Sequence, residues 1–216
     1  MSNIDLTDIE LRFHPKEKSF PYTIDYTKPD GYPDRVPIYF NYDAPYMYYG
    51  VKYLSITYFI FYKDNKAIGL GGVFPKVKSL GYHDRDRELV KILYSVETLK
   101  PEHVFFSAHA QEGRFYKYSD CRFNNNKLIV YSSLNSHSCR KDPGTYIRVL
   151  GLANDNCSDD GKKITPYRIE CNVTYNAQNR EVFSKPLASA FLPFFQPRVE
   201  FLKEKQRKEE EKNNRK

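Results

Sequence analysis

Residues 53–62 read Tyr-Leu-Ser-Ile-Thr-Tyr-Phe-Ile-Phe-Tyr, and aromatic or β-branched side chains fill most of these positions. Such side chains favour a pleated, half-buried surface over a helix. The run is too short for a membrane span, which needs about 20 apolar residues, and Ser55 and Thr57 interrupt it. It therefore predicts a buried strand.

Other strand-like segments surround this run. Residues 168–175 exchange apolar and polar side chains at every step, as in a strand with one wet face. Further segments of strand length are residues 36–42, 88–96, 104–109, 128–134 and 146–150. Because turn-forming Asn, Asp, Gly and Pro separate them, the sequence predicts an all-β protein, an antiparallel β-sandwich.

The ends of the chain differ from its middle. Residues 1–35 hold closely spaced Pro15, Pro21, Pro29 and Pro33, so an irregular lead-in is expected there. The sandwich is expected over residues 36–197. Residues 198–216 are strongly charged and predict a short exposed helix or tail.

The charge and composition of the chain limit the kinds of partner that it is expected to bind. The formal net charge is +7, and much of it lies in Lys203–Lys216, which holds seven Lys or Arg against four Glu. This balance argues against a dedicated nucleic-acid groove, which would cluster basic side chains on one face of the fold. It leaves an acidic partner open for the tail, and a membrane lipid or a protein assembly for the body.

The first ten residues are polar and acidic, unlike a secretory signal. With no membrane-spanning run in view, the sequence predicts a cytoplasmic protein, in which the four cysteines stay reduced.

Candidate site residues gather in the middle of the chain. Asp86 and Glu88 stand two apart and point to one face of a strand, and His83 and His109 lie near strand ends. Calcium and magnesium prefer grouped oxygen ligands, which favours either ion as a cofactor. Alternatively, residues 84–88 alternate in sign and form a solvated turn whose charges pair with one another.

A second acidic stretch, residues 154–161, lacks the bidentate Glu of a calcium-binding loop, since Pro166 stands twelfth when counted from Asp155. We expect an acidic surface turn.

The motifs also carry a family resemblance. His83, Asp86 and Glu88 precede a β run, and Ser107-x-His109 and Asn135-Ser-His137 follow. With Gly151-Leu-Ala-Asn-Asp155 downstream, residues 36–166 resemble the fungal and plant vacuolar protein sorting-associated protein 62 family.

That family is in turn similar to the necrosis-inducing cytolysins, whose Gly-His-Arg-His-Asp-Trp-Glu motif helps to bind a divalent cation in a β-sandwich that engages membrane sphingolipids. The resemblance implies Asp86 and Glu88 as ligands with His83 and His109 nearby. His137 and Asp155 match the first family only. Arg87 replaces the Trp that both families place between the two acids, so the packing behind the site must differ.

Three functions remain open at this point. The leading hypothesis is a non-enzymatic β-sandwich module for binding or assembly, with a structural divalent cation. The second is a metal-dependent hydrolase that uses His83, Asp86, Glu88 and His109. The third is a scaffold or particle component with a basic tail.

Overall fold

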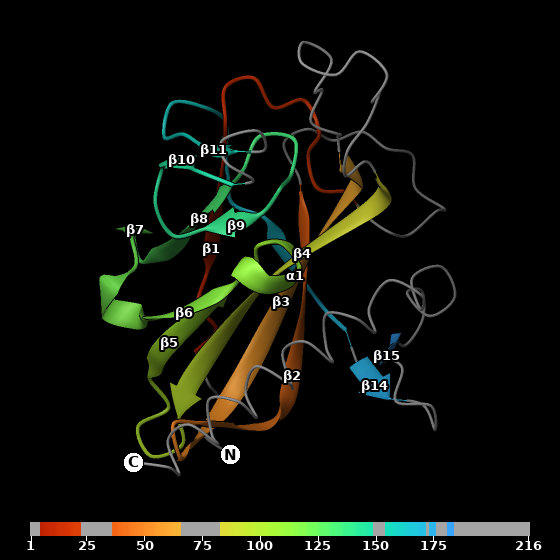
Figure 1. Ribbon diagram of the computed structural model, residues 1–216. Helices are drawn as coiled ribbons and strands as arrows, with labels where there is room; N and C mark the ends of the chain where they lie inside the picture. The colour runs from red at the N-terminus through yellow and green to blue at the C-terminus, as the bar shows by residue number, and fades with distance from the viewer. Residues whose placement is uncertain are drawn as a thin grey trace.

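A computed structural model describes residues 5–22, 36–65, 83–148, 154–171, 173–175 and 181–183 of the chain. The aromatic run becomes β3 (Val51–Asn65), which lies inside a six-stranded sheet of order β13-β2-β3-β4-β5-β6 (Figure 1). The other members are β13 (Tyr167–Glu170), β2 (Pro37–Tyr48), β4 (His83–Ser95), β5 (Pro101–Phe106) and β6 (Arg114–Lys117).

A smaller sheet packs on one face of the large one. Its order is β12-β1-β8-β7, and β9 also pairs with β8. Its strands are β1 (Ile9–Phe13), β7 (Phe123–Asn124), β8 (Lys127–Ser132), β9 (Cys139–Arg140) and β12 (Lys163–Ile164). Among the described residues, the remaining elements are α1 (His109–Glu112), the 3-10 turn Tyr118–Asp120, β10 (Gly144–Tyr146) with β11 (Asp155–Cys157), and β14 (Val173–Tyr175) with β15 (Glu181–Phe183).

The core between the two sheets is built on alternate residues of β3. Ile56, Tyr58, Ile60 and Tyr62 are fully buried there with side chains of β1 and β8, such as Leu11. Buried phenols need hydrogen-bond partners. Tyr58 Oη donates to the carbonyl of Thr7 at 3.0 Å, and Tyr62 Oη lies 3.0 Å from Ser132 Oγ.

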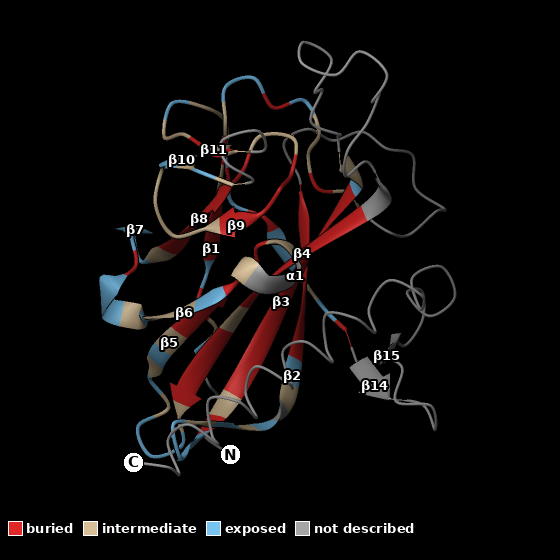
Figure 2. Ribbon diagram, viewed as in Figure 1, coloured by how far each residue is buried: buried red, intermediate tan, exposed pale blue. Residues whose placement is uncertain are grey.

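The intervening residues of β3 face the other side of the large sheet. Phe59 and Phe61 are buried there in a second cluster with Tyr39, Leu89 and Phe105. The middle of β3 is therefore buried on both faces, which explains why its sequence is almost continuously apolar (Figure 2).

The predicted all-β sandwich is confirmed, and most strand pairs are antiparallel. Two pairs are parallel instead: β1 with β8, and β13 with β2. Within the described residues, no helix is long and apolar enough to cross a membrane.

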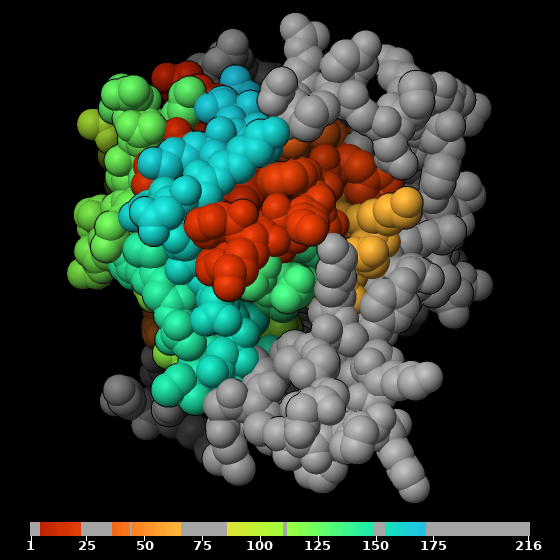
Figure 3. Space-filling model, turned by 90° about the horizontal axis from the view of Figure 1, so that it is seen from above, coloured from red at the N-terminus to blue at the C-terminus, as the bar shows by residue number. Residues whose placement is uncertain are grey.

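The N-terminal segment differs from the irregular lead-in that we expected. Ile9, Leu11 and Phe13 alternate into the core, and β1 lies between β8 and β12. Seen from above, this segment lies against residues near 160 (Figure 3). The prediction was wrong because it applied the effect of the prolines to the whole segment. All of the prolines follow β1, and the first of them is Pro15.

Two other expectations need correction. The alternating stretch 168–175 is divided between β13 and β14, because β13 ends at Glu170. The acidic stretch 154–161 contains β11, and its Asp155 is fully buried, so this part is not a surface turn. The charged tail, residues 198–216, and the end of the predicted sandwich lie outside the described residues.

We predict that Leu11→Ala lowers the free energy of unfolding by about 2 to 5 kcal/mol, because it removes a fully buried side chain from the core. Urea unfolding followed by circular dichroism measures the change. The control is Ile147→Ala, which shortens an aliphatic side chain that is 77% exposed. Equal, small effects of both substitutions would show that β1 is not part of the core.

Candidate functional site

Asp86 and Glu88 lie on the inner face of the large sheet. In the β3–β4 register they stand opposite Tyr62 and Ile60, whose side chains point between the two sheets. Only 2% of Asp86 and 1% of Glu88 is exposed. These two acids are therefore core residues, and the alternative of a solvated turn does not hold for them.

Arg87 points to the opposite face of β4, where it is buried with its guanidinium 5.5 Å from the ring centre of Phe59. The cation thus packs on an aromatic ring, which is favourable in this geometry.

Ser107, just after β5, binds Glu88. Its hydroxyl donates a short hydrogen bond to Glu88 Oε2 and accepts the Leu89 backbone N–H at 2.8 Å. One serine thereby links the carboxylate to the backbone of the same strand. The hydroxyl points at the carboxylate of Glu88, and only 4% of Ser107 is exposed.

His137 contacts Asp86 from the loop between β8 and β9. Its Nδ1 lies 3.2 Å from Asp86 Oδ2, and its ring stacks on Tyr62 at 3.9 Å with an interplanar angle of 4°. Its Nε2 faces Glu17 Oε2 at 3.9 Å. The imidazole is fully buried and lies between two carboxylates, and Asn65 Nδ2 approaches the first of them at 3.5 Å.

Glu17 is fixed by the backbone. Its Oε1 accepts the N–H groups of Lys18 and Ser19, each at 2.8 Å, and its Oε2 accepts the N–H of Asn135 at 2.7 Å. Three backbone donors thus hold this carboxylate in place. Glu17 thereby attaches the segment after β1 to the β8–β9 loop.

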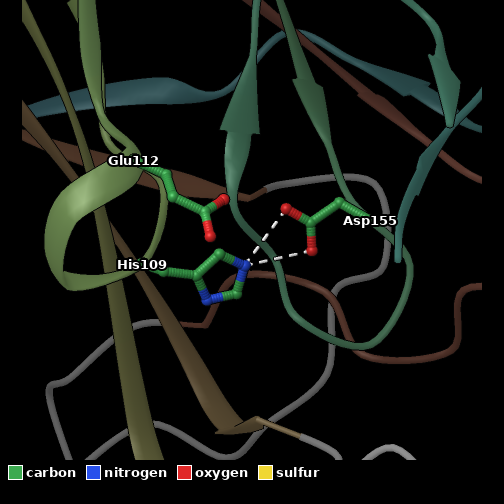
Figure 4. Close-up of side chains that lie close together, drawn as sticks. All are labelled: His109, Glu112 and Asp155. Carbon is green, nitrogen blue, oxygen red and sulfur yellow. Dashed lines mark hydrogen bonds and ion pairs between the residues drawn. The ribbon is translucent and has the colours of Figure 1, made fainter. Parts of the chain in front are cut away.

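Asp155, in β11, is the centre of a second group, the Asp155 cluster, which consists of His109, Glu112, Arg140, Arg148 and Asp155. His109 Nε2 lies 3.1 Å from both carboxylate oxygens of Asp155 (Figure 4), and Arg140 Nη2 donates to Oδ2. Ser136 Oγ donates to Oδ1 at 2.7 Å. Burial by itself would raise the pKa of Asp155, but the hydrogen bonds and charges of these partners outweigh it and hold the pKa well below its ordinary value.

Glu112 completes the Asp155 cluster from α1. Arg140 Nη2 donates to it at 2.9 Å and Arg148 Nε at 2.6 Å. Burial opposes ionisation here too, yet the two guanidinium groups lower the pKa of Glu112. The positive charges of Arg140 and Arg148 thus offset the negative charges of Glu112 and Asp155.

His109, Glu112 and Asp155 each offer a ligand atom within 4.8 Å of the others, which suits a divalent cation by ligand type. Arg140 and Arg148 already donate to the two carboxylates, so an ion at this position would have to displace them. The donor set fits a cation, but the neighbouring charges oppose one.

The predicted site residues therefore fall into two linked groups. Asp86 contacts His137, whereas His109 contacts Asp155. The two groups join through the β8–β9 loop, because Ser138 Oγ lies 2.8 Å from His109 Nε2. His83 pairs through its backbone with Asn65 at the start of β4, and its side chain is outside the described part of the structure.

Sequence reasoning missed Glu17, Glu112, Arg140 and Arg148. Glu112 could have been found, because it follows His109 by three residues and a helical turn brings such positions together. The arginines and Glu17 gave no signal, since only the fold brings them to residues far away in the sequence.

Comparison with known proteins places the chain in a family. The family profile described as vacuolar protein sorting-associated protein 62 matches residues 45–212. Among curated proteins, no sequence match is found.

Two solved structures are similar to the chain. One is the crystal structure of Necrosis and Ethylene inducing Protein 2 from the causal agent of cocoa's witches' broom disease, with 15% identity, a TM-score of 0.43, and coverage of 76% of this chain and 70% of that one. The other is NLPPya in complex with mannosamine, with 12% identity, a TM-score of 0.42, and coverage of 76% and 68%.

We predict that Asp155→Asn destabilises the protein at pH 7 by about 3 to 5 kcal/mol, because it removes the buried charge of Asp155 and leaves the half-buried Arg140 with one carboxylate fewer. The folded-state pKa of Asp155 is lowered, so its carboxylate adds stability above the unfolded pKa of about 4, and this is lost as the pH falls through the folded value. The loss of stability between pH 5 and pH 2 should therefore be shallower in the variant, as measured by thermal unfolding across that range.

The matched control is Asp160→Asn, which changes an exposed acid of the same segment. It should leave the pH profile of unfolding unchanged. Identical profiles for wild type and Asp155→Asn would show that the Asp155 cluster does not stabilise the fold.

Proposed function

Since the chain belongs to the vacuolar protein sorting-associated protein 62 family, we propose that it is a non-enzymatic β-sandwich module for binding or assembly. One observation carries the proposal: the side chains capable of chemistry are buried and bonded to one another. Asp155 and His137 are fully buried, and Asp86 and Glu88 nearly so. Such groups hold the fold together and are out of reach of a substrate.

The arrangement of Ser138, His109 and Asp155 deserves comparison with a hydrolase. In a serine hydrolase, one imidazole nitrogen faces the serine and takes its proton, and the other faces the acid, which holds the ring in place and stabilises the imidazolium. Here Nε2 of His109 lies against both Ser138 and Asp155. One nitrogen cannot serve as base for the serine while it is committed to the acid, and Ser138 is itself fully buried. This geometry supports a structural function over a hydrolytic one.

A structural calcium or magnesium ion is the second part of the proposal. Asp86 and Glu88 supply buried carboxylate oxygens from one face of a central strand, and hard divalent ions prefer such ligands. His137 is the histidine in contact with Asp86, whereas His109 is bound to Asp155. We therefore assign the carboxylates as ligands and His137 as their neighbour.

A scaffold function through the basic tail remains a prediction, because residues 203–216 lie outside the described residues. Truncation before Lys203 would test it independently of the ion.

If Asp86 and Glu88 bind the ion, calcium or magnesium at about a hundred times its dissociation constant stabilises the fold by about 2.7 kcal/mol. Asp86→Asn should remove most of this gain, because it takes away one charged ligand. Calorimetry of wild type and variant in calcium, magnesium and excess chelator measures the effect.

Asp160→Asn serves again as the control, since it removes an acid at the surface, and it should keep the full response to the ion. Identical melting of the wild type in all three buffers would rule out the cation site. Cation-dependent turnover of an ester or lipid panel would overturn the non-enzymatic assignment.

A further inference from the structure

We propose that residues 14–20, which we call the strap, form a gate that controls access from solvent to Asp86 and His137, and thereby the entry of a cation. The inference rests on the proposed function, because it concerns the regulation of the same site. One side chain, that of Glu17, holds the gate closed. Its opening is a local motion that leaves both sheets intact.

The proposed ligands are closed off from solvent. Only 2% of Asp86 and 1% of Glu88 is exposed, and His137 is fully buried. An ion that enters from solvent therefore requires part of the covering structure to move. The strands around the site are unsuited to this movement, because their inner face is closely packed with buried side chains such as Ile60 and Tyr62.

The strap is the outermost layer over the site. Glu17 Oε2 lies 3.9 Å from Nε2 of His137, and Nδ1 of the same ring lies 3.2 Å from Asp86 Oδ2. Lys16 and Lys18, on either side of Glu17, are exposed. The order from solvent inward is therefore strap, imidazole and carboxylate. Seen from above, the N-terminal part of the chain, in red, lies across the middle of this face (Figure 3).

The strap lies between two fixed points and is mostly exposed. At one end β1 is paired, and the Phe13 N–H donates to the Lys162 carbonyl at 3.0 Å. At the other end the Tyr22 N–H donates to the Phe61 carbonyl at 3.1 Å. Within the strap, only Glu17 is buried. A short segment with fixed ends and few buried side chains opens locally at a lower free energy than the sheets.

One carboxylate joins the strap to the loop beneath it. Oε1 of Glu17 accepts two N–H groups of the strap itself, each at 2.8 Å, and Oε2 accepts the N–H of Asn135 at 2.7 Å. Asn135 belongs to the β8–β9 loop, which has its own attachment, because Ser136 donates to Asp155 at 2.7 Å. The loop therefore stays in place when the strap opens, and Glu17 is the contact that must break.

Phe20 supplies the other contact of the strap. Its ring lies 5.0 Å from that of Phe13 at an interplanar angle of 75°, and the Lys162 ammonium lies 5.1 Å from its centre. Edge-to-face rings and a cation over a ring both favour the closed position. Loss of the Glu17 carboxylate should thus loosen the strap without detaching it from the fold.

The first test is amide hydrogen exchange of the full chain in excess chelator, followed by NMR. The amides of Lys18, Ser19 and Asn135 share one acceptor, so they should show equal protection, although Asn135 stands 118 positions after Glu17. They should exchange much faster than the amides of β3, which open only with the whole sheet. Low urea concentrations should not accelerate their exchange, because a local opening exposes little surface.

Glu17→Ala removes the contact that holds the strap. Exchange of the Asn135 amide should become about tenfold faster, because its charge-assisted hydrogen bond is lost. Exchange of the imidazole C2 proton of His137, measured by mass spectrometry in heavy water, should accelerate by a similar factor, since it depends on solvent access. The matched control is Glu97→Ala, which removes an exposed acid and should leave both rates unchanged.

The second test uses terbium, a luminescent substitute for calcium. Its release into excess chelator should be about tenfold faster from Glu17→Ala, while its dissociation constant changes less than about threefold, because a gate alters binding and release together. An equal release rate in wild type and Glu17→Ala would overturn the proposal.

The exchange data also separate the gate from the cation site. Unrelated protection of the three amides, or their exchange only by global unfolding, would overturn the gate even if Glu17→Ala were too unstable to study. A wild type that binds neither calcium nor terbium, yet exchanges the three amides together, would refute the cation site of the proposed function. The two failures are therefore distinguishable.

Discussion

A buried carboxylate must be compensated, and Asp155 shows how far this requirement shapes the protein. Its oxygens accept hydrogen bonds from Ser136 and Arg140 and lie against His109. Ser136 and Arg140 come from the β8–β9 loop and β9, and His109 comes from α1, so one acid in β11 fixes two segments that are separate from it in the sequence. Because an unpaired buried charge costs several kcal/mol, none of these segments can move away alone.

The large sheet is polar at one end of its inner face, where Asp86 contacts His137. β3 and β4 pair from Asn65–His83 to Tyr53–Ser95, so the same two strands connect these polar groups with the β4–β5 turn at the other end. Between them the core is apolar on both faces of β3. The buried polar groups thus lie at one end of an otherwise apolar core.

The all-β fold was predictable because runs of aromatic and β-branched side chains are typical of strands. Asp86 and Glu88 were predictable as neighbours on one face, since the period of a strand is two. The strand at Ile9–Phe13 was missed because the prolines after it dominate that region. The contacts of His137 with Asp86, and of His109 with Asp155, join residues that are far apart in the sequence, and no local pattern encodes them.

The buried polar side chains form one coupled structural unit. A double-mutant cycle between Asp155→Asn and Arg140→Gln, followed by urea unfolding at pH 7, measures this coupling. Each substitution alone leaves one partner of the ion pair without the other, so the double variant should lose at least about 1 kcal/mol less than the sum of the two. Losses that add to within about 0.5 kcal/mol would show instead that Asp155 and Arg140 act independently.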